Sequence, residues 1–126
     1  MKTKMFTVLA MTMILGGSAF AVGMPQTINN DRDLKHALKA AKTPEDHQRI
    51  ADYCQAKADN LKAKAMGYEQ AAQSLRGTPL AKNTTAPNTP ARYEALAKEL
   101  RTEAQSNEQL AASNEQMARV VTRASK

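Results

Sequence analysis

The sequence predicts an all-α protein: an antiparallel two-helix hairpin with an alanine-rich, coiled-coil-like seam, preceded by a short helix and by a cleaved signal peptide. Three observations carry this prediction. The first 21 residues have the composition of a secretory leader. Two Thr-Pro pairs, Thr43-Pro44 and Thr89-Pro90, have the chemistry of helix starts. After each pair, small and apolar residues recur with alternating spacings of four and three.

Residues 1–21 are typical of a leader for export. Two lysines give a positive start, residues 5–15 form an apolar run broken only by two threonines, and residues 19–21 have the small-x-small pattern that signal peptidase accepts. The apolar run is shorter than the roughly 20 residues that cross a bilayer. We therefore expect cleavage after Ala21, rather than a retained anchor, and a periplasmic or secreted bacterial protein without a transmembrane segment in the mature chain.

Composition narrows the class of protein that follows the leader. The formal charge of the whole chain is +6. Because two lysines and no acid leave with the leader, the charge falls to +4, with both signs interspersed. The chain has no Trp, and a dense basic stripe with stacking aromatics is missing, which argues against a nucleic-acid partner. Non-specific adhesion to an acidic surface stays open.

Next along the chain, residues 22–30 are expected to be a mobile segment, and residues 31–41 a short helix. Asn30 or Asp31 can cap this helix, and leucines and alanines make one apolar face. The face favours packing against one end of the hairpin. Residues 31–126 are therefore predicted to form a single helical domain.

The first long helix is predicted over residues 44–75. Thr43 can cap it, Pro44 suits the first helical position, and Glu45 and Asp46 favour the helix dipole in the first turn. The connection, residues 76–88, is rich in Gly, Pro, Asn and Thr, which are turn and loop formers. A loop of this length reverses the chain and favours antiparallel packing.

The second long helix is predicted over residues 90–122 and starts like the first. Residues 43–75 and 89–121 also align without a gap, with several identities, many of them alanine, which suggests an internal repeat. The seam of the first helix is predicted to be His47, Ala51, Cys54, Ala58, Leu61, Ala65, Tyr68, Ala72 and Leu75. The seam of the second is predicted to be Tyr93, Ala97, Leu100, Ala104, Asn107, Ala111, Asn114, Ala118 and Val121.

The two asparagines leave the exact buried face of the second helix open. Asn107 and Asn114 either lie on the seam as polar intrusions, or the apolar face is rotated toward Leu96, Leu110 and Met117 and the asparagines lie at its edge.

Cys54 is the only cysteine, which is notable for a chain expected in an oxidising compartment. Three interpretations follow. The thiol is a small buried apolar group on the seam, or it forms an intermolecular disulfide between two chains, or it is a reactive or metal-binding group. No base is indicated beside it for a nucleophilic role.

The one metal hypothesis joins His47, Cys54 and Met117. His47 and Cys54 share a helix face, and in an antiparallel hairpin Met117 approaches that end. Imidazole, thiolate and thioether are ligands that copper(I) accepts. A separation of about 10 Å along the helix axis between His47 and Cys54 argues against a shared ion.

No catalytic constellation or cofactor motif is present, so we expect a protein that is not an enzyme. The pattern favours a structural or protein-interaction module of the bacterial envelope, acting with a protein partner or by self-association. Two alternatives remain: a periplasmic chaperone-like or envelope-stress helper, and a periplasmic copper-binding protein.

Overall fold

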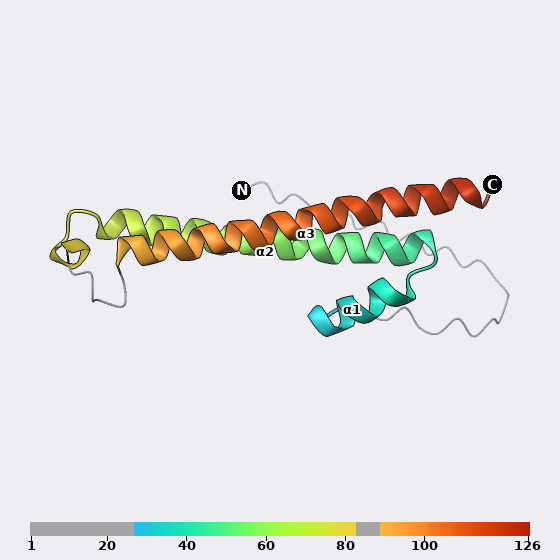
Figure 1. Cartoon of the computed structure of the whole chain (residues 1–126), viewed down its shortest axis with the longest axis horizontal. Coiled ribbons are helices and arrows are strands. Elements are labelled where there is room, and N and C mark those ends of the chain that lie inside the picture. The colour runs from blue at the N-terminus through green and yellow to red at the C-terminus, as the bar shows by residue number, and fades with distance from the viewer. Residues whose placement is uncertain (1–26, 83–88) are drawn as a thin grey trace, which may run out of the picture.

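The computed structural model describes residues 27–82 and 89–126, and in this part of the chain every regular element is helical. The elements are α1 (Asp31–Ala40), α2 (Pro44–Leu75), the 3₁₀ turn η1 (Pro79–Lys82) and α3 (Pro90–Ala124). The two long helices run side by side in opposite directions, and α1 folds back along the first half of α2 (Figure 1). The predicted leader and its cleavage point lie outside the described residues.

Both long helices start where the Thr-Pro pairs lie. The Thr43 hydroxyl accepts a hydrogen bond from the Asp46 N–H (3.1 Å), and the Asp46 carboxylate accepts from the Thr43 N–H (3.0 Å) in return. The Lys42 N–H also donates to this carboxylate, and these backbone bonds hold the pKa of Asp46 below its ordinary value. Thr89 caps α3 by accepting from the Arg92 N–H.

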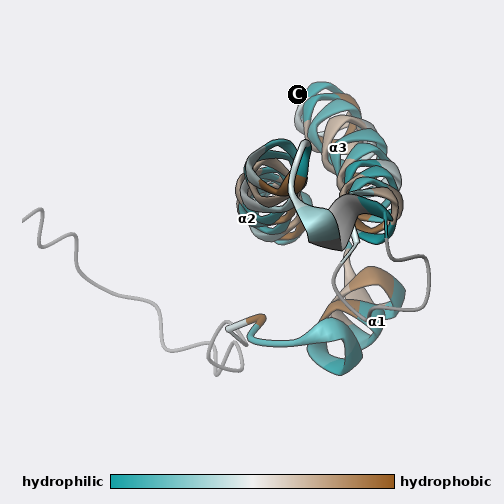
Figure 2. Cartoon of the chain, turned by 90° about the vertical axis from the view of Figure 1, so that its left-hand side faces the viewer, coloured by the Kyte–Doolittle hydropathy of each residue, from teal (hydrophilic) through white to brown (hydrophobic). Residues whose placement is uncertain are grey.

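The seam consists of the residues that the 4-3 spacing indicates. On α2, His47, Cys54 and every seam alanine are buried, and on α3 both Asn107 and Asn114 are buried with the seam alanines. The alternative with a rotated face is wrong, because Met117 is exposed while the asparagines are covered. Alanine at every second seam position lets the backbones approach closely, so a narrow seam leaves the outer surfaces of both helices largely hydrophilic (Figure 2).

Polar pairs along the edges of the seam hold the antiparallel register. Four ion pairs join the two arms of the hairpin: Lys57 with Glu103, Lys62 with Glu108, Glu69 with Arg101, and Arg76 with Glu94. The pair of Glu69 and Arg101 is bidentate, with nitrogen–oxygen distances of 2.7 and 2.8 Å. Near the loop, the rings of Tyr68 and Tyr93 stack with centroids 5.7 Å apart.

Helix α1 covers only the end of the hairpin that lies opposite the loop. Leu34 packs into a cluster with Ile50, Cys54 and Ala111, which brings all three helices together. Lys57 strengthens this junction, since its ammonium contacts Asp31 of α1 at 2.8 Å and Glu103 of α3 at 3.4 Å. The hydrogen bond to Asp31 is the main reason why the pKa of Lys57 is raised.

The chain just before α1 also contacts the hairpin. Residues 27–30 belong to the segment expected to be mobile, yet Ile28 packs against the three-helix cluster and the Asn30 side chain caps α1. The physical reason is that burial of the large apolar side chain of Ile28 against the core removes it from water. Among the described residues, no helix is long and apolar enough to cross a membrane.

Candidate functional site

The most distinctive chemistry within the seam is a buried hydrogen bond between the two long helices. His47 Nδ1 lies 3.0 Å from Asn114 Oδ1, and both side chains are buried. The Asn114 amide nitrogen donates to the Leu110 carbonyl at 2.9 Å, so its oxygen faces the imidazole. An oxygen can only accept, which assigns the proton of this bond to His47 Nδ1.

This pair is suited to fixing geometry rather than to chemistry on a substrate. Both the oxygen and the nitrogen of the Asn114 amide have hydrogen-bond partners. Among the described residues, no buried side-chain nitrogen or oxygen lacks a partner. Because a buried polar group without a partner is costly, any shift of α3 against α2 at this level is penalised. The pair therefore selects one register at the end of the hairpin where α2 begins.

Cys54 lies in the cluster where the three helices meet, and 0% of its surface is exposed. Burial raises the pKa of its thiol, and this effect outweighs the nearby Lys57 ammonium, which lowers it. A thiol rather than a thiolate is therefore held in the core, and thiolate is the reactive form. A disulfide between two chains remains a prediction, and in this fold it requires local opening of the seam before the sulfur can meet a partner.

The three residues of the copper hypothesis are not gathered in the seam. His47 and Cys54 are buried, whereas Met117 is 47% exposed. His47 already uses Nδ1 in its bond to Asn114. Across residues 27–82 and 89–126, no group of three or more His, Cys, Asp or Glu side chains is placed to hold a metal ion.

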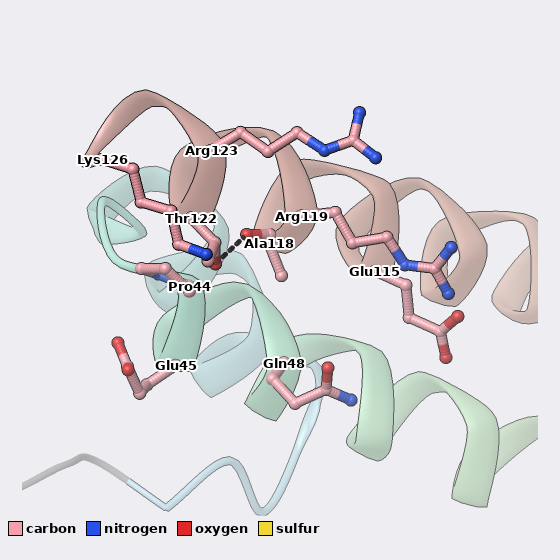
Figure 3. A pocket seen from close by; sticks show the side chains of 9 residues that line it. All are labelled: Pro44, Glu45, Gln48, Glu115, Ala118, Arg119, Thr122, Arg123 and Lys126. Atoms are coloured by element: carbon pink, nitrogen blue, oxygen red, sulfur yellow. Dashed lines mark hydrogen bonds between the residues drawn. The ribbon is translucent and has the colours of Figure 1, made fainter.

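A shallow depression of about 750 Å³ lies at the open end of the hairpin, between the start of α2 and the end of α3 (Figure 3). Its wall on α2 includes Glu45 and Gln48, and its wall on α3 carries several charged side chains. The full lining is Pro44, Glu45, Gln48, Glu115, Ala118, Arg119, Thr122, Arg123 and Lys126. Thr122 donates its hydroxyl hydrogen to the Ala118 carbonyl at 2.8 Å, so this lining hydroxyl already has a hydrogen-bond partner. The depression is a surface feature of mixed charge, not an enclosed pocket.

Comparison of the chain with protein-family models, with curated proteins and with solved structures finds no match in any of the three.

Sequence reasoning placed both His47 and Asn114 near the seam but did not pair them. The pair could have been predicted from the register, that is, from which residues of α2 and α3 lie opposite each other. The stack of Tyr68 on Tyr93 and the bond of His47 to Asn114 fit one antiparallel alignment of the two seams. That alignment also makes α3 continue past the first residue of α2, which the sequence pattern alone does not indicate.

Proposed function

We propose that this protein is exported and acts in the bacterial envelope as a rigid helical-hairpin module that binds a protein partner or a second copy of itself. The observation that carries the proposal is the locked register of α2 and α3. A buried polar bond holds the open end, and a tyrosine stack and four ion pairs hold the remainder.

A locked register makes the outer faces of the hairpin a fixed surface. The 32 residues of α2 span about 48 Å at 1.5 Å per residue. Along this length the outward side chains are mostly polar or charged, and they keep constant spacing because the seam does not slide. Such a surface suits recognition of an extended partner, in which rigid presentation lowers the entropy lost on binding.

The export part of the proposal is supported by the leader-like composition of residues 1–21. The experiment is expression of the full chain in a Gram-negative bacterium, followed by fractionation and intact mass measurement. We expect a periplasmic or secreted product that starts at Val22. An unprocessed product retained in the cytoplasm would contradict export.

The interaction part is tested in the same cells with a photo-crosslinking amino acid at one exposed position per variant. Met66 and Met117 are suitable, since both are exposed and lie in different halves of the hairpin; exposed Asn60 serves as a polar comparison site. One or two discrete adducts, confined to one face, are expected for a dedicated partner or a dimer. A broad ladder of adducts would indicate a chaperone-like helper instead. A monomer without adducts at any site would contradict the proposal.

A further inference from the structure

The net charge of the protein is concentrated at one end of the molecule. We call residues 35–49 and 112–126 the basic end, since they meet where α1 ends, α2 begins and α3 ends (Figure 1). Its basic residues are Lys35, Lys39, Lys42, Arg49, Arg119, Arg123 and Lys126, and its acidic residues are Glu45, Asp46 and Glu115. Of the 18 basic residues of the chain, two lie in the predicted leader and seven here, which leaves nine; of the 12 acidic residues, nine are left. The rest of the chain after the leader is therefore neutral.

The basic residues at this end have fewer ion-pair partners. Elsewhere after the leader, four of the nine basic residues (Lys57, Lys62, Arg76 and Arg101) form ion pairs with carboxylates of another helix or of the same hairpin. Within the described part of the chain, the one ion pair at the basic end joins Arg49 to Asp46. The other six cations are exposed and take part in no ion pair there. Their charge is therefore directed to solvent.

Large apolar side chains are exposed at the same end. Leu38 is 39% exposed, Met117 47% and Val120 52%. Met66, which is 53% exposed, lies instead in the half of α2 nearer the loop. Arg119 and Arg123 flank Val120 along α3, and Lys35, Lys39 and Lys42 surround Leu38 in the sequence. Figure 3 shows the two arginines extending from the last turns of α3 rather than folding back onto α2.

We propose that the basic end binds the surface of an anionic phospholipid membrane. Interfacial attachment needs cations for the phosphate headgroups and aliphatic side chains that enter the boundary with the acyl chains, and this end presents both. A soluble polyanion would be attracted by the cations alone and would gain nothing from exposed leucine, methionine and valine. The rest of the hairpin is neutral and is therefore not attracted to the anionic surface, so it can project away from the membrane. The inference adds a lipid surface to the interaction module proposed above.

The experiment is sedimentation of the protein, expressed from its full chain, with vesicles of phosphatidylglycerol or of phosphatidylcholine. Intact mass first establishes that the product starts at Val22, so that the leader cannot contribute binding. We expect binding to phosphatidylglycerol, little to phosphatidylcholine, and release at high salt, because the Debye length shrinks to about 3 Å at 1 M.

Two pairs of variants separate the basic end from the rest of the surface. Each cation near an anionic surface is worth about fivefold in affinity, so Arg119→Gln with Arg123→Gln should weaken binding roughly 25-fold. Met117→Ser with Val120→Ser should weaken it roughly tenfold. The matched controls are Lys64→Gln with Lys98→Gln, which removes two exposed cations elsewhere, and Met66→Ser; each should change affinity less than about twofold.

Helical circular dichroism confirms that every variant is folded. Equal losses in the two charge variants, or equal binding to both lipids, would overturn the assignment. Binding to polyglutamate or heparin without binding to vesicles would overturn it too, in favour of a soluble polyanion. Because the vesicle measurement requires no protein partner, its failure leaves the proposed interaction module untouched, and the photo-crosslinking result leaves the lipid assignment untouched.

Discussion

At the scale of single residues, the bond between His47 and Asn114 is expected to stabilise the seam. Asn114→Ala removes the acceptor and leaves a buried N–H without a partner, which should lower the free energy of unfolding by about 2 kcal/mol. Replacing both partners with leucine should recover most of this loss, since neither side then carries an unpaired polar group. Urea unfolding followed by circular dichroism measures both values. Asn60→Ala, at an exposed site of α2, is the control, and an equal effect there would refute the role of the pair.

Asp46 should make the stability of the protein depend on acid pH. Its pKa is lowered by the backbone N–H groups of Lys42 and Thr43, so the folded state binds the proton less readily than the unfolded state. The contribution is therefore complete above the unfolded value near 3.9 and is lost as pH falls through the lower folded value. Asp46→Asn should be less stable by about 0.5–1 kcal/mol at pH 7. The gap should narrow steadily as the pH falls below about 3.9 in thermal unfolding; a gap that stays constant down to pH 2 would contradict the assignment.

At the scale of the helices, the alanines of the seam set how closely α2 and α3 approach. Ala65 is fully buried on the seam, while Ala63, two residues earlier, is exposed. Ala65→Leu should cost about 1–3 kcal/mol because the added atoms push the helices apart, whereas Ala63→Leu should stay within about 0.5 kcal/mol. Denaturant midpoints compare the two directly. Similar midpoints would mean that close packing at this level does not stabilise the hairpin.

The helices could be predicted from the sequence because the features that define them are local. Thr43 and Thr89 cap the helices that begin at Pro44 and Pro90, and the 4-3 spacing selected the face that is buried. These features depend on hydrogen bonds and periodicity within one segment. The orientation of Met117 away from the seam was left open because two faces of α3 have similar apolar content, and only contact with α2 decides between them.

At the scale of the whole molecule, the features that sequence reasoning missed all depend on register. The partner of His47, the bridging position of Lys57 between three helices and the gathering of cations at one end each require knowing which residues of α3 lie opposite α2. Alanine is repeated so regularly along both seams that a shift by one heptad preserves the apolar pattern. Polar residues on the seam, such as Asn114, distinguish these registers because they need a hydrogen-bond partner on the opposite helix. That partner is known only once the two helices are placed side by side.

The measurement that tests this account most directly is zero-length cross-linking of amines to carboxylates, on an equal mixture of unlabelled and ¹⁵N-labelled protein. The antiparallel hairpin predicts links between Lys62 and Glu108 and between Lys57 and Glu103, where 3.4 Å separate the ammonium and the carboxylate. The packing of α1 against α2 predicts a link between Lys57 and Asp31, at 2.8 Å. Each linked peptide pair should be wholly light or wholly heavy, because both partners belong to one chain. Links that combine light and heavy peptides at these positions, or links that join Lys62 to carboxylates near the start of α3, would contradict the hairpin and its register.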